Sequence, residues 1–430
     1  MNITVFPSRL SGHVAAPPSK SVMQRLIAGA LLADGVSEIH NISQSDDCTS
    51  ALLLCSQLGG EIEVGENAVR IKGTAGKISP RAKELTPGES GLAARLFTPI
   101  AALTASELTM IAEKSLQGRP MSQYESVFSS LGGSIHTTDG SFPLAINGPL
   151  QGGTFKLDGK LSSQFLTGLL TALPSAPSDS SIEVVDLASK PYIELTLEVL
   201  ADFGIEINAS DDLSHFAFRG NQSFAPIQTV VDGDWSGAAA LAVAGMLCAE
   251  SSLQISGLDN QYTQADEAIR GALLFAGGAL SGTEDGIQVA RRPVRPFRLD
   301  LTESPDLFPV MAALAAHGKK PSTLVGIHRL VHKESNRAKA IQTEWAKLGI
   351  QVELDDASDS MIVKPRPANS RPTSDLDAHG DHRLVMAQTI LGMAGNHAIA
   401  ITGIDCVAKS YPEFFDDLET LGAQLLLKQR

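Results

Sequence analysis

Residues 345–354, WAKLGIQVEL, contain the pattern that decides the fold: an apolar helix end, a glycine and then an alternating strand. The pattern occurs six times, with its glycine at Gly59, Gly132, Gly204, Gly277, Gly349 and Gly422. Successive glycines are 73, 72, 73, 72 and 73 residues apart, which chance placement would not produce. Glycine adopts the left-handed conformation after a helix without steric cost, so each of these glycines is predicted to end a helix. The chain is therefore predicted to repeat one unit of about 72 residues.

Each unit also contains an apolar helix rich in Ala, Leu and Gly, and these six helices begin near residues 18, 88, 161, 233, 304 and 380. A helix that is apolar nearly all round is expected to be buried. The second helix of a unit, such as ESNRAKAIQTEWAKL at 334–348, carries charge on one face and is expected at the surface. Buried helices walled by sheets and surface helices predict an inside-out α/β architecture. A chain of 430 residues is long enough for two domains.

The composition excludes several classes of function. A formal net charge of -14 argues against nucleic-acid or anionic-membrane partners, which require a basic surface. Cys48, Cys55, Cys248 and Cys406 have no metal-ligand spacing and are expected to be reduced thiols in the cytoplasm. No metal site is predicted. The first residues do not resemble a secretion signal, no apolar run reaches transmembrane length, and no Gly-x-Gly-x-x-Gly motif indicates a dinucleotide site.

Positive side chains occur near the predicted starts of several helices. Lys20, Arg25, Arg95 and Arg383 oppose the helix dipole there, at a cost of about 0.3–1 kcal/mol each. Lys333 and Arg337 are predicted to form a like-charge pair one helical turn apart. An anionic ligand bound across these helix ends would reverse the sign of each cost, because the free N–H groups there also attract anions.

Each of these residues also has an ordinary structural explanation when it is considered alone. Ser19 and Lys20 could be a helix cap with a solvated lysine, Arg119 a loop arginine and His382 a hydrogen-bonded turn residue. The recurrence in six units favours a shared anion-binding opening instead.

Several segments together resemble the enolpyruvyl transferase family, over nearly the whole chain and in the same order. They are PPSKSVMQR (17–25), GKLSSQFLTGLL (159–170), SKPYIELTLEVLADFGI (189–205), VDGDWSGAAALAV (231–243), HKESNRAKAIQTEWAKLG (332–349), GDHRLVMA (380–387) and VAKSYPEFFDDLETLGA (407–423). The resemblance implies two domains, each of three βαβαββ repeats, formed by 20–230 and by 1–19 plus 231–430. It implies a cytoplasmic monomer without metal or organic cofactor, whose cleft closes on its substrates.

The resemblance is strongest to family members that act on shikimate 3-phosphate. It implies transfer of the carboxyvinyl group of phosphoenolpyruvate to the 5-hydroxyl of shikimate 3-phosphate, with release of phosphate through a tetrahedral intermediate. The implied catalytic residues are Asp306 as the base, with Glu334 and Lys20 as candidates for the other proton transfers. The residues implied to bind shikimate 3-phosphate are Ser21, Arg25, Ser162, Ser163, Gln164, Ser189, Tyr192, Asp306 and Lys333. Those implied to bind phosphoenolpyruvate are Lys20, Gly91, Arg95, Arg119, Gln164, Arg337, His382, Arg383 and Lys409.

The chain departs from the family pattern at four positions. Glu89 stands where the family has an amide, Leu92 replaces a hydroxyl that normally caps the same turn, Arg329 stands where an asparagine is common, and Asn336 replaces an aspartate. A carboxylate beside a phosphate site is costly unless Glu89 points outward, pairs with a cation or is protonated. The altered helix start is also expected to change sensitivity to glyphosate, which competes for the phosphoenolpyruvate site in this family.

Three alternatives remain open. A UDP-N-acetylglucosamine enolpyruvyl transferase has the same fold and donor, but typically carries Lys-Asn near the N-terminus and often a cysteine in the loop where this chain has LQGRPM. A non-catalytic anion-binding relative is suggested by Glu89, Leu92 and Asn336. RNA-terminal phosphate cyclases share the repeat architecture, and the acidic composition argues against them.

Overall fold

The computed structural model describes residues 1–258 and 261–428, and the chain divides into two compact units. The N-terminal unit comprises Pro18–Asp232 and Gln261–Gln264. The C-terminal unit comprises Met1–Pro17 and, among the described residues, 233–258 and 265–428. Within these described ranges, no helix combines the length and the apolar character needed to cross a lipid bilayer.

Each unit contains three four-stranded sheets, and all six sheets have the same internal order. One outer strand pairs in parallel with its neighbour, and the two further pairings are antiparallel. The N-terminal unit has the sheets β14-β3-β5-β4, β6-β7-β9-β8 and β10-β11-β13-β12, and the C-terminal unit has β16-β17-β15-β2, β18-β19-β21-β20 and β22-β23-β1-β24. This internal repetition confirms the six predicted units and the inside-out α/β architecture.

The strands of the N-terminal unit are β3 (Val36–His40), β4 (Glu61–Val64), β5 (Ala68–Lys72), β6 (Glu84–Leu85), β7 (Leu108–Met110), β8 (Ser134–Thr138), β9 (Ser141–Asn147), β10 (Thr154–Asp158), β11 (Ser180–Val185), β12 (Asn208–Ala209), β13 (His215–Phe218) and β14 (Gln228–Val230). Those of the C-terminal unit are β1 (Asn2–Val5), β2 (Leu10–Ala15), β15 (Ala249–Ser256), β16 (Ala279–Gly282), β17 (Ile287–Ala290), β18 (Arg298–Asp300), β19 (Ser322–Val325), β20 (Val352–Asp355), β21 (Ser360–Val363), β22 (Leu376–Asp377), β23 (Ile399–Thr402) and β24 (Leu425–Lys428).

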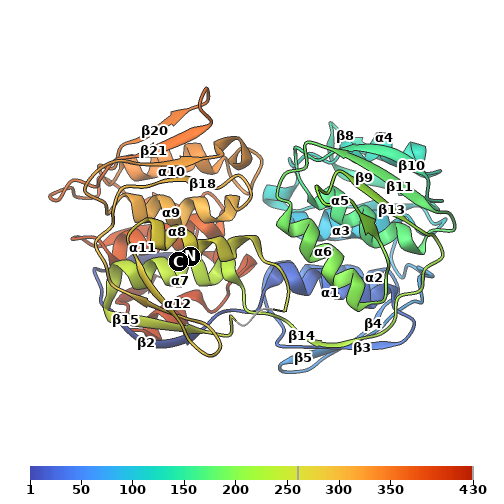
Figure 1. The fold of residues 1–430 in the computed structure, drawn as a ribbon, viewed down its shortest axis with the longest axis horizontal. Coiled ribbons are helices and arrows are strands. Elements are labelled where there is room, and N and C mark those ends of the chain that lie inside the picture. Colours follow the sequence, from blue (N-terminus) through green and yellow to red (C-terminus); the bar gives the residue numbers. More distant parts are fainter. Residues whose placement is uncertain (259–260, 429–430) are drawn as a thin grey trace. The chain divides into compact units, whose positions relative to one another are not determined.

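The apolar helix of each repeat is buried, as its composition predicts (Figure 1). These helices are α1 (Lys20–Leu32), α3 (Gly91–Ala101) and α5 (Gln164–Ala172) in one unit, and α7 (Trp235–Cys248), α9 (Phe308–Ala315) and α11 (His382–Met393) in the other. In the N-terminal unit α3 packs against both α1 and α5, and in the C-terminal unit α7, α9 and α11 pack against one another. The helices therefore form the centre of each hydrophobic core.

The second helix of each repeat lies farther out and exposes part of its surface. These helices are α2 (Asp46–Gln57), α4 (Gln123–Ser130), α6 (Pro191–Asp202), α8 (Ile269–Phe275), α10 (Arg337–Ala346) and α12 (Phe414–Thr420). The glycine that follows each of them has a positive φ, between 74° at Gly349 and 113° at Gly59. The predicted left-handed helix ends are thus confirmed.

One sequence-based expectation about these helices is wrong. Lys333 does not share a helix with Arg337, because α10 begins at Arg337. The Asn336 side chain accepts a hydrogen bond from the Lys339 N–H (3.2 Å) and caps the helix. Lys333 therefore lies in the preceding turn, and the predicted like-charge pair one helical turn apart does not exist.

The first strand of the chain completes the last sheet of the C-terminal unit. β1 lies between β23 and β24 and is antiparallel to both, so Asn2 is paired with Thr402 on one side and Lys428 on the other. The N-terminal unit closes in a comparable way, since β14, its last strand, is parallel to β3, its first.

Candidate active site

Lys20 is the first residue of α1, and its charge is neutralised within the N-terminal unit. Its Nζ donates to Asp47 Oδ2 at 2.8 Å, and both side chains are largely buried. Ser19 caps the same helix by accepting from the Val22 N–H. The carboxylate of Asp47 therefore offsets the cost of a cation at this helix start.

Arg25 lies one turn farther along α1 and is 3 % exposed. Its Nε donates to Thr196 Oγ1 (2.9 Å), Nη1 to the Ser21 carbonyl (2.7 Å) and Nη2 to the Tyr192 carbonyl (3.1 Å). Burial lowers the pKa of the Arg25 guanidinium to about 10. All three contacts are to neutral oxygens, so a nearby anion would gain strongly from this charge.

A second cationic group surrounds the start of α3. Arg95 Nη1 donates to Gln164 Oε1 (2.8 Å), and its guanidinium lies 4.9 Å from the centre of the Phe165 ring. A Cβ on Gly91 would lie 2.7 Å from Arg119 Nη1 and 3.3 Å from Arg95 Nη1. Gly91 therefore lets two guanidinium groups approach the N-terminus of α3. We call Gly91, Arg95, Arg119 and Gln164 the α3 cluster.

Both arginines of the α3 cluster are buried, with Arg95 5 % and Arg119 8 % exposed. Tyr124 helps to fix the backbone beneath them, since its hydroxyl donates to the Arg95 carbonyl (2.6 Å) and to the Phe165 carbonyl (3.2 Å). Burial of two like charges against one helix start excludes the explanation that these are solvated loop residues.

The predicted serine and tyrosine residues lie near two helix starts in the same unit. Ser162 Oγ accepts from the Gln164 N–H (3.3 Å) at the beginning of α5, and Ser163 beside it is buried. Ser189 has a φ of 58°, and its carbonyl accepts from the Tyr192 N–H (3.2 Å). Because Tyr192 also contacts Arg25 through its carbonyl, the structure brings these two predicted residues together.

Glu89 is paired with a cation, which is one of the three arrangements expected to offset the cost of a carboxylate beside a phosphate site. Its Oε1 accepts from Lys114 Nζ (2.9 Å), and its Oε2 accepts from Ser115 Oγ (2.9 Å). The hydrogen bond to Glu89 raises the pKa of Lys114. Leu92 replaces a hydroxyl that normally caps this turn. Here Ser90 caps the helix, because its Oγ accepts a hydrogen bond from the Ala93 N–H (3.3 Å).

In the C-terminal unit, Asp306 lies in η4 (Pro305–Leu307), directly before α9, and is surrounded by cations. Lys333 Nζ lies 3.1 Å and Arg337 Nη1 lies 2.7 Å from its Oδ1, and Arg383 Nη2 lies 3.8 Å from its Oδ2. Burial opposes ionisation of Asp306, but Lys333, Arg337 and Arg383 outweigh it and hold the pKa well below its usual value. Burial also lowers the pKa of Lys333.

Arg337 is the centre of this arrangement and is 1 % exposed. Besides Asp306, its Nη2 donates to Glu334 Oε2 (2.8 Å) and its Nε to Asp381 Oδ2 (2.8 Å). Burial disfavours its charge, but Asp381, Glu334 and Asp306 more than compensate and raise its pKa well above the usual value. We call Asp306, Lys333, Glu334, Arg337, Asp381 and Arg383 the Asp306 cluster.

The remaining predicted residues of this unit are also buried. His382 and Lys409 are 1 % and 2 % exposed. Asp381 caps α11 by accepting from the Arg383 N–H (3.0 Å). Burial opposes the charge of Arg383, but Asp306, Asp234 and Asp266 outweigh it and raise its pKa.

Sequence reasoning missed two carboxylates that form ion pairs with these cations: Asp47, which contacts Lys20, and Asp381, which contacts Arg337. Asp381 could have been found, because an aspartate directly before an apolar helix is a capping signal. Asp47 could not, because it belongs to another segment than the cation it balances. Among residues 1–258 and 261–428, no group of three or more His, Cys, Asp and Glu side chains is arranged to hold a metal ion.

In the C-terminal unit, the Asp306 cluster suits the binding of a small anion beside a carboxylate that can accept a proton. Buried guanidinium groups at helix starts bind phosphate and carboxylate groups by charge-assisted hydrogen bonds. Asp306, kept ionised by its neighbours, is a candidate general base.

Comparison with known proteins gives a family. The family model described as EPSP synthase (3-phosphoshikimate 1-carboxyvinyltransferase) matches residues 5–418. The chain is 34% identical over 424 residues to a 3-phosphoshikimate 1-carboxyvinyltransferase of Clostridium kluyveri, covering 98% of both chains. It is 32% identical over 426 residues to the protein of that name from Methanocaldococcus jannaschii, again covering 98% of both.

Solved structures support the same fold. An EPSP synthase from Acinetobacter baumannii has a TM-score of 0.80 at 23% identity and covers 100% of both chains. The enolpyruvyl transferase NikO from Streptomyces tendae has a TM-score of 0.78 at 18% identity, covering 99% of this chain and 98% of its own. Six repeats, cations buried at helix starts and a family match over nearly the whole length therefore agree that the chain belongs to the EPSP synthase (3-phosphoshikimate 1-carboxyvinyltransferase) family.

Proposed function

We propose that this protein transfers the carboxyvinyl group of phosphoenolpyruvate to the 5-hydroxyl of shikimate 3-phosphate and releases phosphate, a step in aromatic amino acid biosynthesis. The observation that carries the proposal is Asp306, a carboxylate held by Lys333 and Arg337 in a chain that matches this family over residues 5–418.

The reaction requires four proton transfers. The 5-hydroxyl oxygen forms a bond to C2 of phosphoenolpyruvate and loses its proton to Asp306, while C3 gains a proton to become a methyl group. The C2–O bond to phosphate then breaks as the bridging oxygen gains a proton, and the methyl group loses a proton, which restores the double bond. We assign the proton transfers at C3 and at the bridging oxygen to Glu334 and Lys20.

The cations around Asp306 also connect substrate binding to its basicity. A strongly lowered pKa makes a carboxylate a weak base. Arg337 and Arg383, which we assign to phosphoenolpyruvate with His382 and Lys409, would share their charge with the bound anion. Their pull on Asp306 would then weaken and its pKa would rise toward the working range when substrate is present.

We assign the residues of the N-terminal unit from the family resemblance. Arg95 and Arg119, together with Gly91, Lys20 and Gln164, are proposed to hold phosphoenolpyruvate. The contacts proposed for shikimate 3-phosphate are Ser21, Arg25, Ser162, Ser163, Gln164, Ser189 and Tyr192, with Asp306 and Lys333 from the C-terminal unit. Converging cations in a site from which water is excluded would also stabilise the charge that develops in the transition state.

The first experiment measures phosphate release from phosphoenolpyruvate with shikimate 3-phosphate as acceptor. The unchanged protein should turn over, and Asp306→Ala should reduce kcat by about 10²–10⁴, the usual contribution of a general base. Binding of shikimate 3-phosphate to the variant should remain measurable by calorimetry. Binding without turnover in the unchanged protein would instead favour the non-catalytic relative, and turnover with UDP-N-acetylglucosamine would favour the other transferase.

The second experiment tests the α3 cluster. In Gly91→Ala the new Cβ would displace Arg119 and Arg95, so the KM for phosphoenolpyruvate should rise about tenfold or more as charge-assisted contacts are lost. Gly271→Ala, in α8 with open space around the new Cβ, is the control and should leave KM unchanged. Equal KM values in the two variants would show that the α3 cluster does not bind phosphoenolpyruvate.

A further inference from the structure

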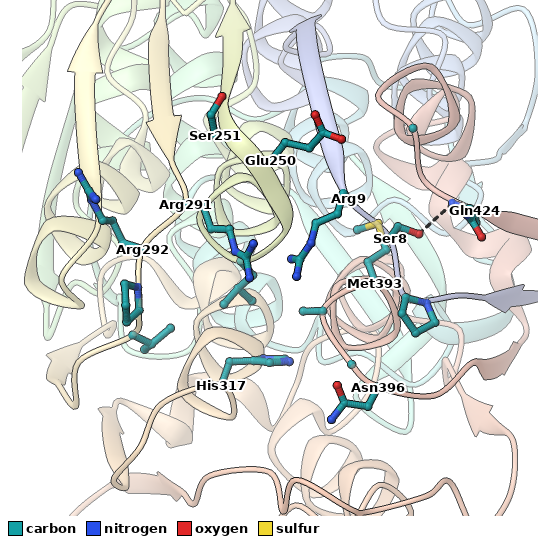
Figure 2. Close-up of a pocket in the computed structure, with 17 residues that line it drawn as sticks. Ser8, Arg9, Glu250, Ser251, Arg291, Arg292, His317, Met393, Asn396 and Gln424 are labelled. Atoms are coloured by element: carbon teal, nitrogen blue, oxygen red, sulfur yellow. Dashed lines mark hydrogen bonds between the residues drawn. The ribbon is translucent and has the colours of Figure 1, made fainter.

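A large cavity opens in the C-terminal unit at the far ends of the three buried helices (Figure 2). Its volume is about 1140 Å³. Leu247 near the end of α7, His317 just after α9 and Met393 at the end of α11 belong to its lining. The Asp306 cluster lies at the other ends of α9 and α11. No residue of that cluster lines the cavity, and α11, which runs between them, is about 18 Å long, so the two are separate.

The cavity is lined by positive charge in a chain whose net charge is -14. Arg9, Arg291 and Arg292 line it together with His317, and Glu250 is the one carboxylate among its lining residues. Figure 2 shows the side chains of Arg9 and Arg291 reaching into the same space, above His317. Concentrating cations in this way is unfavourable unless an anion offsets their repulsion.

The arginines do not serve as helix caps, which would be the ordinary explanation for cations at helix C-termini. Instead, a backbone N–H from a crossing segment pairs with one carbonyl at the end of each helix: Arg292 N–H donates to Met246 O, Arg366 N–H to Ala316 O and Ser8 N–H to Met393 O. Elsewhere in this unit an arginine does cap a helix, since Arg366 Nη1 donates to the Leu391 carbonyl at 3.0 Å.

The cavity guanidinium groups are available to a ligand. Among the described residues, no hydrogen bond or ion pair engages the side chains of Arg9, Arg291 or Arg292. Burial raises the pKa of the Cys248 thiol to about 12, and Arg9 and Arg291 are the charges that pull it down. Both guanidinium groups therefore lie near the same buried thiol.

The positive lining continues beyond the cavity. A neighbouring cavity of about 380 Å³ shares Arg292 and adds Arg295, Lys319 and Lys320. A ligand with a single anionic group would leave most of these cations unmatched. The two cavities together fit a ligand of several anionic groups, each paired with one or two of the cations.

We propose that this cavity binds a small organic anion with two or more phosphate or carboxylate groups, held by Arg9 and Arg291. Because the opening is wide, recognition would depend on charge more than on enclosure, and binding should weaken as salt is added. The site is independent of the proposed transferase reaction, and either could fail without the other.

The test is protection of individual arginines from phenylglyoxal, read by peptide mass spectrometry on the full-length protein. Pyrophosphate and citrate are the probes, one for phosphate and one for carboxylate groups. Either probe should slow modification of Arg9 and Arg291 by about fivefold or more, as expected when a bound anion occupies the guanidinium groups. Arg298, an exposed arginine of the same unit outside both cavities, should react at an unchanged rate.

Variants complete the test. In Arg9→Gln and Arg291→Gln, protection of the remaining arginine should require about tenfold more probe, and Arg298→Gln should have no effect. All three should keep the phosphate-release activity of the unchanged protein without probe. Equal modification of Arg9 and Arg291 with and without both probes would overturn the proposal, and so would equal protection of Arg298.

Discussion

Asp266 is a carboxylate whose surroundings oppose its ionisation. It is 2 % exposed and accepts a hydrogen bond from the Ser236 hydroxyl. Burial and the negative charge of Asp306 raise its pKa to about 6, although Arg383 and Ser236 act in the other direction. A buried acid with this pKa changes charge near neutrality, beside the Asp306 cluster.

The raised pKa predicts a pH dependence of stability. The folded state holds the Asp266 proton more tightly than the unfolded state, where the pKa is near 3.8. Its contribution is therefore complete below about pH 4 and is lost as the pH rises through 6, by roughly 3 kcal/mol in total. The side chain introduced by Asp266→Asn cannot ionise. The urea midpoint of this variant minus that of the unchanged protein should therefore be larger at pH 7.5 than at pH 4.5.

The control for this measurement is Asp285→Asn, which alters an exposed carboxylate of the same unit. The difference between Asp285→Asn and the unchanged protein should be the same at both pH values. An Asp266→Asn difference that does not change with pH would show that Asp266 ionises normally in the folded protein.

At the scale of single residues, the sequence predicts which cations lie at helix starts but not which groups balance their charge. Lys20, Arg95 and Arg383 are marked by their place at apolar helix starts. Their partners come from elsewhere in the chain: Asp47 contacts Lys20, and Asp306 contacts Arg383. Spacing within a helix reports only local neighbours, so long-range ion pairs of this kind are found only in the folded chain.

The helix-ending glycines are the elements that sequence reasoning predicted best. Gly204 has a φ of 77°, and the space where a Cβ would lie is open, so its conformation alone requires glycine. Gly271 in α8 has the same open space and an ordinary helical conformation. Comparing alanine substitutions at the two positions therefore measures the cost of a left-handed conformation without a contribution from packing.

Replacing both glycines with alanine should have opposite effects on stability. Gly204→Ala should lower the free energy of unfolding by about 1–2 kcal/mol, because alanine is strained at positive φ. Gly271→Ala should raise it by about 0.5–1 kcal/mol, the usual preference of a helix interior for alanine. Urea unfolding measures both, and a stabilising Gly204→Ala would mean that the turn relaxes to a negative φ.

Helix starts were harder to predict than helix ends. The pattern of charged residues at 332–337 predicts a continuous helix. However, α10 begins only at Arg337, because Asn336 caps it. A polar side chain that competes with the helix for backbone N–H groups can end or begin a helix inside an otherwise regular pattern. The consequence is that Lys333 is placed in a turn, from which it reaches Asp306.

At the scale of the whole molecule, the repeat predicts the number of sheets but not where the chain enters each unit. Gln261–Gln264 belong to the N-terminal unit although residues 233–258, which precede them among the described residues, belong to the other. Asp232 holds this segment, since its carboxylate accepts from the N–H groups of Gln261 (3.0 Å) and Tyr262 (2.8 Å). No repeat or motif marks the segment, because it lies in a connection outside the repeated elements.

The separate cores predict that the N-terminal unit can fold alone. A fragment of residues 18–232 retains all three of its sheets and lacks only Gln261–Gln264 of the unit's residues. It should show a helical circular dichroism spectrum and a single cooperative urea transition. A fragment of residues 75–232, which lacks β3, β4 and β5, is the control and should not unfold cooperatively. A non-cooperative 18–232 fragment would show that the unit depends on the rest of the chain.

The position of β1 between β23 and β24 sets an order of events during synthesis. Residues 2–5 are synthesised before the whole N-terminal unit, but their partners at 399–402 and 425–428 are synthesised after it. At 5–20 residues per second, β1 waits about 20–80 s for its sheet. The N-terminal unit, whose last strand ends at Val230, can close well before then. β1 therefore stays an unpaired strand, open to chaperones and to wrong partners, until β23 and β24 have been synthesised.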